Sequence, residues 1–283
     1  MIASRVHGDG NGWVVCSVGH RYWGRYGSAG LLLRSLDAQA DVHVLMQHRA
    51  PWTHDGDTWG IPGGARDSHE SPPEAAVREA GEEAGIVPDD VVVRDIQRDD
   101  HGGWVYDTVV AETTRPVHPV ANAESVQLRW VRERDVESLP LHPGFARSWP
   151  SLRARPVTVV IDAANVVGSR PDGWWKDRQG ATRRLLAAMQ TLRGRVTRHN
   201  GTWVVLAGAE LVAEGAARGI RSASWVRVVD AAGSGDDTVV ARAGVVTDPL
   251  VVTADRGLRA RLGIGVSVAG AGWLLDLLPD RSP

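Results

Sequence analysis

The sequence has very little cysteine and no long apolar run. Cys16 is the only cysteine among 283 residues, so an internal disulfide is excluded, and this usage fits a reducing compartment. No apolar stretch approaches the roughly 20 residues needed to cross a bilayer. The first 13 residues also lack the apolar core of a secretory signal. We therefore expect a cytoplasmic protein without a membrane segment.

Lysine is nearly absent as well, because Lys176 is the only one among 32 basic residues. The net charge of −2 conceals a difference between the halves: residues 1–153 hold 15 Arg against 22 Asp and Glu, a balance of −7, and the remainder balances at +5. The length suits two domains, which we place at residues 1–150 and 151–283. A modestly basic second half is compatible with nucleic-acid binding.

What the sequence does have is a dense set of charged residues and glycines at fixed spacing. The pattern G-x5-E-x7-R-E-x-x-E-E-x-G is met by Gly64, Glu70, Arg78, Glu79, Glu82, Glu83 and Gly85, and the apolar Ile86 follows it. Within this stretch, Ser71, Pro72 and Glu74 predict the start of a helix. Gly85 predicts its end.

The acidic residues of this helix stand where a purely structural helix would avoid them. Glu79, Glu82 and Glu83 are spaced i, i+3, i+4, so they share a face and repel one another. They also occupy the last turns, where the helix dipole disfavours anions. A hard divalent cation resolves the conflict, because it binds clustered carboxylate oxygens. The alternative is a solvated acidic face.

The complete spacing resembles the signature of the Nudix hydrolase family, with Ala80 smaller than the bulky apolar residue usual there. The resemblance covers about residues 26–150 and implies an α/β/α sandwich with a mixed sheet. It also implies hydrolysis of a diphosphate linked to another group, usually a nucleoside. Elements typical of the NADH and coenzyme A branches are absent, and Tyr106 lies further from Ile86 than the diadenosine-polyphosphate branch prefers. A nucleoside triphosphate is therefore the expected substrate.

The same resemblance assigns roles to residues of the motif. It implies that Mg²⁺ or Mn²⁺ is held by Glu79, Glu82, Glu83 and a carbonyl of Gly63 or Gly64, and that Glu70 pairs with Arg78 to fix the loop. The general base stays open among Glu83, Asp107 and Glu124, the last two being alternatively ordinary surface carboxylates. Trp13, Tyr22, Trp23 and Tyr26 form an aromatic cluster that either packs or stacks a base.

Apolar stretches around the motif predict the strands of the first domain. Residues 29–36 and 42–47 are predicted to form a hairpin, residues 58–64 a short strand and turn, and residues 103–111 and 126–131 two further strands. Residues 141–156 are rich in proline and arginine, and we interpret them as a linker.

Beyond residue 156, apolar strands alternate with a helical pattern. Strands are predicted at residues 158–161, 202–206, 225–229, 250–253 and 266–269, and a helix at residues 181–199. This alternation favours a parallel sheet flanked by helices. In such sheets ligands gather outside the carboxyl ends of the strands. Four carboxylates, those of Asp162, Asp236, Asp237 and Asp255, are expected there.

Three short motifs of this half resemble the NYN branch of PIN-like ribonucleases: DAAN at residues 162–165, GSGDD at 233–237 and TADRGLRARL at 253–262. The resemblance implies a Rossmannoid domain that cleaves RNA with bound metal. Asp162, Asp237 and Asp255 would bind the metal, Asp236 would assist, and Asn165 would position phosphate or water.

Simpler roles stay open in this half. Asp236 can be a helix cap and Asp255 a turn residue, and the segment 174–176, Trp-Trp-Lys, can either stack on RNA or pack. Two functions are therefore expected for the whole chain. One is a Nudix pyrophosphohydrolase with a ribonuclease-like domain. The other is an RNA-processing protein whose Nudix domain trims ends or senses a nucleotide.

Overall fold

The computed structural model describes residues 8–113, 115, 117–171 and 173–279. Part of the N-terminal segment considered above, residues 1–7, lies outside the described residues. The chain divides into two compact units, Met1–Arg153 and Ala154–Pro283. Among the described residues, no helix is long and apolar enough to cross a membrane.

A seven-stranded mixed sheet forms the centre of the first unit. Its strands are β3 (Ser28–Leu36), β4 (Val42–Arg49), β5 (Trp59–Gly60), β6 (Gly63–Ala65), β7 (Val91–Asp100), β8 (Val105–Thr113) and β9 (Ser125–Arg132). β3 pairs antiparallel with β4 and β6 and parallel with β8, so the predicted hairpin is confirmed. A separate antiparallel hairpin, β1 (Trp13–Val15) and β2 (Arg21–Trp23), precedes this sheet.

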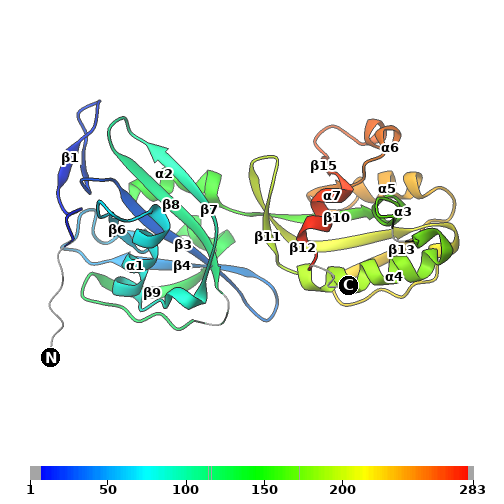
Figure 1. Ribbon diagram of the computed structural model, residues 1–283, viewed down its shortest axis with the longest axis horizontal. Helices are drawn as coiled ribbons and strands as arrows, with labels where there is room; N and C mark the ends of the chain where they lie inside the picture. The colour runs from blue at the N-terminus through cyan, green and yellow to red at the C-terminus, as the bar shows by residue number, and fades with distance from the viewer. Residues whose placement is uncertain (1–7, 114, 116, 172, 280–283) are drawn as a thin grey trace. The chain divides into compact units, whose positions relative to one another are not determined.

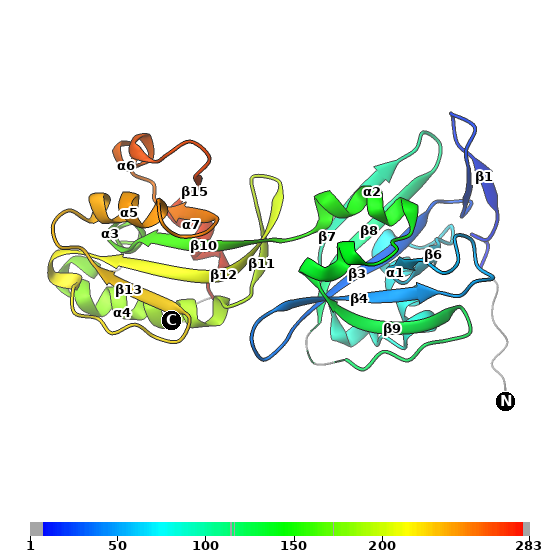
Figure 2. The same ribbon diagram turned by 180° about the vertical axis from the view of Figure 1, so that it is seen from behind.

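Two helices, α1 (Pro72–Ala84) and α2 (Pro143–Leu152), lie on opposite faces of the sheet (Figures 1 and 2). Strand alternation explains this arrangement. Leu31, Leu33 and Val109 pack with the alanines of α1 in one core. The alternate residues, such as Leu32 and Val110, are buried on the other face. The expected mixed sheet between helices is therefore present.

The proposed linker at residues 141–156 is wrong, because α2 occupies most of it. Phe145, Trp149 and Leu152 recur at helical spacing, and all three are buried. Pro143 is tolerated in the first turn, where its missing N–H has no helical partner. The proline and arginine content thus predicted a linker wrongly, whereas the spacing of the large apolar residues is that of a helix.

The second unit contains a six-stranded sheet in which most neighbours are parallel. The strands are β10 (Arg155–Asp162), β11 (Val196–His199), β12 (Thr202–Ala213), β13 (Val226–Asp230), β14 (Pro249–Val252) and β15 (Ser267–Ala269). β10 pairs parallel with β12 and β14, β12 with β13, and β14 with β15. Only β11, among the described strands of this sheet, pairs antiparallel, with β12.

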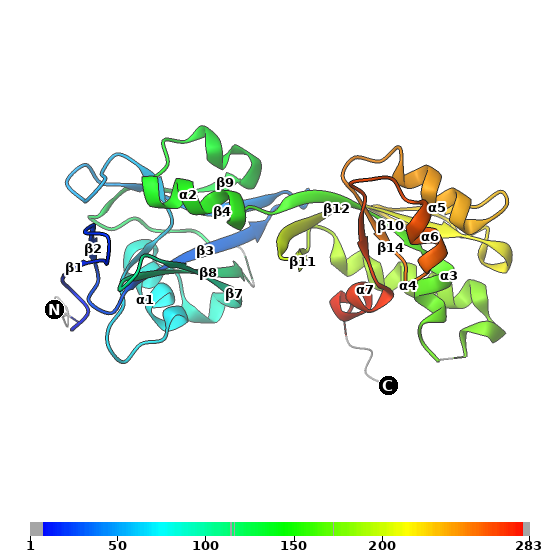
Figure 3. The same cartoon turned by 90° about the horizontal axis from the view of Figure 1, so that it is seen from above.

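Helices cover both faces of this second sheet (Figure 3). One apolar core includes residues of α3 (Ala163–Gly168), α4 (Arg178–Met189) and α7 (Ala271–Leu277), and another includes residues of α5 (Gly235–Ala243) and α6 (Arg256–Arg261). Short 3-10 turns complete the chain: η1 (Pro88–Asp90), η2 (Glu133–Ser138), η3 (Trp174–Lys176), η4 (Gln190–Leu192) and η5 (Gly215–Ala217).

The helix expected at residues 181–199 is too long at its C-terminal end. α4 ends at Met189, and residues 196–199 form β11. The cause is the pair Asn200-Gly201, whose φ angles of 48° and 78° make a two-residue turn into β12. Positive φ at both positions is typical of the tight hairpin turns that Asn-Gly favours.

Candidate active site

The acidic motif folds as a loop followed by a helix with well-defined ends. Ser71 and Glu74 form a reciprocal capping box at the start of α1, and Gly85 ends it with a left-handed φ of 68°. Both predicted boundaries are confirmed. α1 therefore presents Glu79, Glu82 and Glu83 from a fixed position beside β6.

Arg78 ties this loop to the helix. Its Nε donates to Glu70 Oε1 at 2.6 Å, its Nη2 to Glu70 Oε2 at 3.0 Å, and the same Nη2 to the carbonyl of Ala65 at 2.9 Å. The expected pair with Glu70 is therefore present. The hydrogen bonds with Arg78 lower the pKa of Glu70, and those with Glu70 raise the pKa of Arg78. Arg78 thus links α1 to the loop at Glu70 and to the end of β6 at Ala65 through charge-assisted hydrogen bonds.

The carboxylates of Glu79, Glu82 and Glu83 differ in burial, and that of Glu83 is the most deeply buried. Glu83 is 5% exposed and accepts a hydrogen bond from the amide of Gly63 at 2.8 Å. Burial, opposed by that bond and reinforced by repulsion from Glu79, raises the pKa of Glu83 to about 7. Burial also raises the pKa of Glu79. Because the last turn of α1 carries no basic residue, this group of carboxylates fits a divalent cation.

The glycines of β6 bring the backbone close to these carboxylates. A Cβ on Gly64 would lie 2.6 Å from the carboxyl carbon of Glu79, so any other residue would displace that side chain. Nη1 of Arg78 lies 2.9 Å from Glu79 and 3.5 Å from Glu82. The carboxylates of Glu79 and Glu82 thus contact Arg78, whereas that of Glu83 faces Gly63.

The structure separates the candidates for the general base. Asp107 is 1% exposed and holds Arg98 through two hydrogen bonds of 2.8 and 3.0 Å, so the surface role considered for it is wrong. Its carboxylate is already engaged in this pair. Glu124 is partly buried and adds to the repulsion at Glu79 and Glu83, which places it near the motif.

A pocket of about 310 Å³ adjoins the motif at Gly63 and Gly64. Aromatic side chains line much of it: Trp13, Tyr22, Trp23, Trp104 and Tyr106. Tyr22 stacks on Trp104 with ring centroids 4.2 Å apart, and Trp13 meets Trp23 edge-on at 5.4 Å. The aromatic cluster therefore packs and lines a pocket at once, which suits a flat ring ligand. Tyr26 is not among the lining residues.

The pocket lining also includes residues that the sequence did not single out. Asp55 and His54 come from the loop after β4, and His142 comes from the start of α2. Their ligand atoms lie within 4.8 Å of one another, as do those of Asp9, Asp67 and His69 elsewhere. No sequence pattern linked His142 to Asp55, since 86 positions separate them.

In the second unit, Asp162 lies at the carboxyl end of β10. Its carboxylate accepts from the amide of Asn165 at 3.1 Å and from the hydroxyl of Thr253 at 3.0 Å. Burial, with repulsion from Asp236 and Glu214, raises the pKa of Asp162. Three carboxylates therefore lie close together there. Glu214 was missed because β12, which ends directly before it at Ala213, runs past the predicted end at residue 206.

The other residues of this predicted site have local roles. Asp255 caps α6 by accepting from the amide of Leu258 at 2.8 Å. Asp237 pairs with Arg261, whose guanidinium also lies 3.9 Å from Asp236. The side chain of Asn165 accepts from the amide of Ala254 at 2.8 Å. Trp174 is partly buried and Trp175 is 56% exposed.

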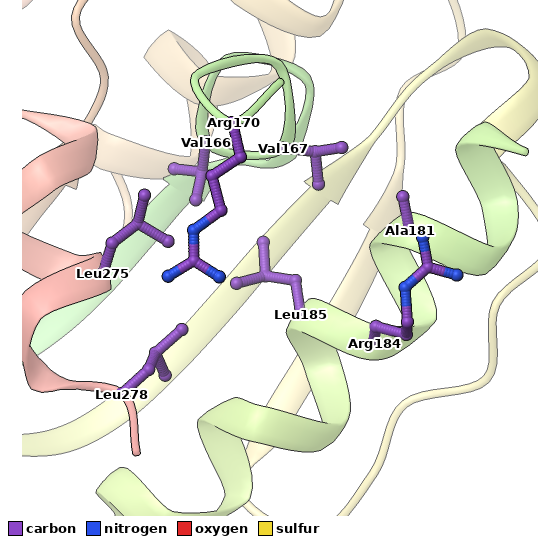
Figure 4. Close-up of a pocket in the computed structure, with 8 residues that line it drawn as sticks. All are labelled: Val166, Val167, Arg170, Ala181, Arg184, Leu185, Leu275 and Leu278. Carbon is purple, nitrogen blue, oxygen red and sulfur yellow. The ribbon is translucent and has the colours of Figure 1, made fainter. Parts of the chain in front are cut away.

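A small hollow lies between α3, α4 and α7 of the same unit (Figure 4). Its volume is about 20 Å³, close to that of one water molecule. Leucines and valines line it, and the side chain of Arg170 extends among them. It is too small to hold a nucleotide.

Known proteins resemble the chain most clearly in the first unit. Residues 26–153 match the NUDIX domain family. A protein of Mycobacterium tuberculosis named "Putative 8-oxo-dGTP diphosphatase 3" is 53% identical over 165 residues, which cover 56% of this chain and 76% of that protein. A nucleoside triphosphate pyrophosphatase/Nudix hydrolase fusion protein of Bifidobacterium longum is 45% identical over 155 residues, 53% of this chain and 32% of that protein.

A solved structure adds a further similarity. The Nudix hydrolase RenU of M. smegmatis is 51% identical, with a TM-score of 0.49, and the match covers 50% of this chain and 92% of that one. Taken with the loop, helix and carboxylates described above, the similarity to the M. tuberculosis protein over three quarters of its length identifies the family. The chain belongs to the Nudix family and is a hydrolase acting on phosphoanhydride bonds.

Proposed function

We propose that the first unit hydrolyses a purine nucleoside triphosphate, of the 8-oxo-dGTP class, to the nucleoside monophosphate and pyrophosphate. The observation that carries this proposal is the continuity between the motif carboxylates and an aromatic pocket, which share Gly63 and Gly64. The carboxylates beside Gly63 and Gly64 suit a metal-bound polyphosphate, and the aromatic lining suits a base. The name of the M. tuberculosis relative points to the same substrate class.

The chain's own residues divide the work between binding and orientation. Mg²⁺ or Mn²⁺, held by Glu79, Glu82 and Glu83, would offset phosphate charge and activate a water. Glu83, anchored by the amide of Gly63, fixes the inner side of that site. The aromatic walls exclude water from the base and orient it. Glu83 or Glu124 then remains to take the proton of the attacking water, since Asp107 is paired with Arg98.

The test is a comparison of substrates with the full chain. Nucleoside triphosphates, 8-oxo-dGTP, nucleotide sugars, dinucleotides and short RNAs are each assayed with Mg²⁺ or Mn²⁺. The expected result is the highest kcat/KM on 8-oxo-dGTP, with pyrophosphate as a product. Preferred cleavage of a nucleotide sugar or dinucleotide would contradict the substrate assignment.

Arg78→Ala is expected to lower kcat by about tenfold to a hundredfold, the usual loss when a residue that orients metal ligands is removed. Without Arg78, the links from Glu70 and Ala65 to α1 disappear, and the backbone at Gly63 and Gly64 loses its support. Steady-state kinetics over a range of Mg²⁺ concentrations measure the effect. Arg94→Ala is the control, because Arg94 pairs with Glu112 across β7 and β8 and not with a residue of the motif. Equal losses in both variants would contradict a positioning role for Arg78.

For the second unit we propose a PIN-like domain that binds RNA and cleaves it with the help of a bound divalent cation. The parallel order of β10, β12 and β14 supports this, as does the group formed by Asp162 at the end of β10, Glu214 directly after β12 and Asp236 in the first turn of α5. Asp237 and Asp255 belong to the same proposed site, although in this structure the first pairs with Arg261 and the second caps α6. Phosphate attraction to the arginines of this unit would supply most of the RNA affinity.

Asp162→Asn is expected to abolish metal binding and RNA cleavage by the second unit while nucleotide turnover stays within about twofold of wild type. The reason is that Mg²⁺ needs several hard oxygen ligands, whereas the motif on α1 uses none of these residues. RNA affinity should fall less, because it rests on dispersed positive charge and is salt-dependent. Nucleotide turnover, RNA cleavage and RNA affinity are measured on the same full-length variant. A large loss of nucleotide turnover in the folded protein would mean that the two sites are coupled.

A further inference from the structure

The loop between β4 and β5 brings a carboxylate to the pocket in an unusual backbone conformation. Asp55 has a φ of 51°, a left-handed value that few residues other than glycine, asparagine and aspartate adopt. His54 Nδ1 and His142 Nε2 lie 3.2 and 3.1 Å from the same oxygen, Oδ2 of Asp55. All three residues line the pocket. The carboxylate is therefore held in place from two separate elements.

This spacing would suit a transition metal, but the hydrogen bonding of His142 argues against one. The amide of Gly144 donates to Nδ1 of His142 at 3.1 Å, so Nδ1 carries a lone pair. Neutral imidazole then has its proton on Nε2. A metal on Nε2 would require the ring proton on Nδ1, where it would face the amide N–H of Gly144. Burial lowers the pKa of His142, which keeps the ring neutral. The group is therefore a pair of imidazoles around a carboxylate acceptor.

A carboxylate has about four acceptor positions, so the contacts at Oδ2 leave capacity for a ligand. Resting on the proposed function, we propose that Asp55 is the residue that selects oxidised purines, by accepting a hydrogen bond from N7–H of an 8-oxopurine base. Ordinary guanine presents N7 as an acceptor, and oxidation at C8 converts that position to N–H.

The contact at N7 distinguishes 8-oxoguanine from guanine, because it is attractive for one base and repulsive for the other. Facing a carboxylate, N7–H of 8-oxoguanine forms a charge-assisted hydrogen bond. The N7 lone pair of guanine in the same place is repelled and leaves a desolvated acceptor without a donor. The other ring edge cannot supply this discrimination, since N1–H and the amino group are the same in both bases. A preorganised carboxylate at N7 therefore distinguishes the two triphosphates more strongly than added apolar contact would.

A second carboxylate, that of Asp99, also lines the pocket and provides a matched comparison. Asp99 lies on β7 and contacts one imidazole, that of His101, at 3.3 Å. Asp57 provides another control: its φ is 59°, it belongs to the same loop as Asp55, and it is not among the lining residues. Asparagine at any of the three positions removes the charge with little change in volume. At Asp55 and Asp57 it also tolerates the left-handed backbone.

The experiment measures kcat/KM of the full chain for 8-oxo-dGTP and for dGTP. Asp55→Asn and Asp55→Gly, both compatible with positive φ, are expected to lower the ratio of the two values about tenfold or more. Part of the change should come from faster dGTP hydrolysis, since repulsion at N7 is removed. Asp57→Asn, which changes a residue outside the pocket lining, should keep the wild-type ratio. Thermal unfolding of each variant checks that the fold is retained.

Each outcome bears on one proposal or on both. A wild-type ratio near one would overturn the proposed substrate class together with the role of Asp55. A wild-type preference that both Asp55 variants retain would overturn the role of Asp55 alone. The same holds if Asp99→Asn, and not Asp55→Asn, removes the preference.

Discussion

Glu83→Gln is expected to lower kcat on the best nucleotide substrate by about a hundredfold to ten-thousandfold, the range lost when a general acid or base is removed. Glu83 is the most buried of the three motif glutamates on α1, and the amide of Gly63 fixes its carboxylate. The substitution keeps the volume and an oxygen for that bond but removes the charge. Both proposed roles of Glu83, metal ligand and base, depend on the charge.

The stability of this variant should not fall with its activity. A buried carboxylate beside Glu79 and Glu124 is disfavoured without a cation, and a neutral amide removes that repulsion. Unfolding of metal-free Glu83→Gln should therefore occur at the wild-type temperature or above. Such loss of activity without loss of stability is typical of functional residues. A variant that is both inactive and unfolded would not support the assignment.

Glu74→Gln is the matched control on the same helix. Glu74 is exposed, and its carboxylate accepts a hydrogen bond from the amide of Ser71 at 2.8 Å in the capping box. Glutamine serves equally well at this position of a capping box, so kcat should stay near the wild-type value. A comparable loss in Glu74→Gln would indicate that any change in the charge of α1 impairs the enzyme. In that event the special role of Glu83 would be contradicted.

Local sequence signals predicted those elements whose boundaries are set by their own residues. Ser71, Glu74 and Gly85 define α1 through caps that need no distant partner, and both ends were found. The hairpin of β3 and β4 was likewise visible as two apolar runs around a polar turn. The pair of Glu70 and Arg78 was implied by the resemblance to the Nudix signature, and the structure contains it.

Elements that depend on tertiary contacts were missed or misjudged. β7 carries many charged residues and is a strand because β8 pairs with it along most of its length. α2 looked like a linker until Phe145, Trp149 and Leu152 were placed against the sheet. The pocket residues Asp55 and His142 meet only after folding, so no local pattern could join them. A site formed by residues of one segment was thus predictable from the sequence, whereas a site formed by residues of several distant segments was not.

The largest effect on stability is expected from the buried ion pair between Arg34 and Glu133. Arg34 is 2% exposed, and its Nε and Nη2 donate to the two carboxylate oxygens of Glu133 at 3.0 and 2.8 Å. Nη2 also donates to the carbonyl of Leu152 at 2.6 Å. This guanidinium therefore joins β3, η2 and the end of α2.

Glu133→Ala should destabilise the first unit by about 3–5 kcal/mol, because it leaves the Arg34 charge buried without its partner. Glu137→Ala is the control in the same short helix: Glu137 pairs with Arg153 at 2.8 Å, but both side chains are about half exposed, so the loss should be about 1 kcal/mol or less. Hydrogen exchange with mass spectrometry on the full chain measures both, since peptides of β3 and β9 report on the first unit separately from the second.

Replacing both partners, Arg34→Met with Glu133→Leu, should recover most of the loss, because a buried ion pair is often no more stabilising than apolar residues of similar volume. If Glu133→Ala and Glu137→Ala lower the free energy of unfolding equally, the effect of Glu133→Ala does not come from burying the unpaired charge of Arg34.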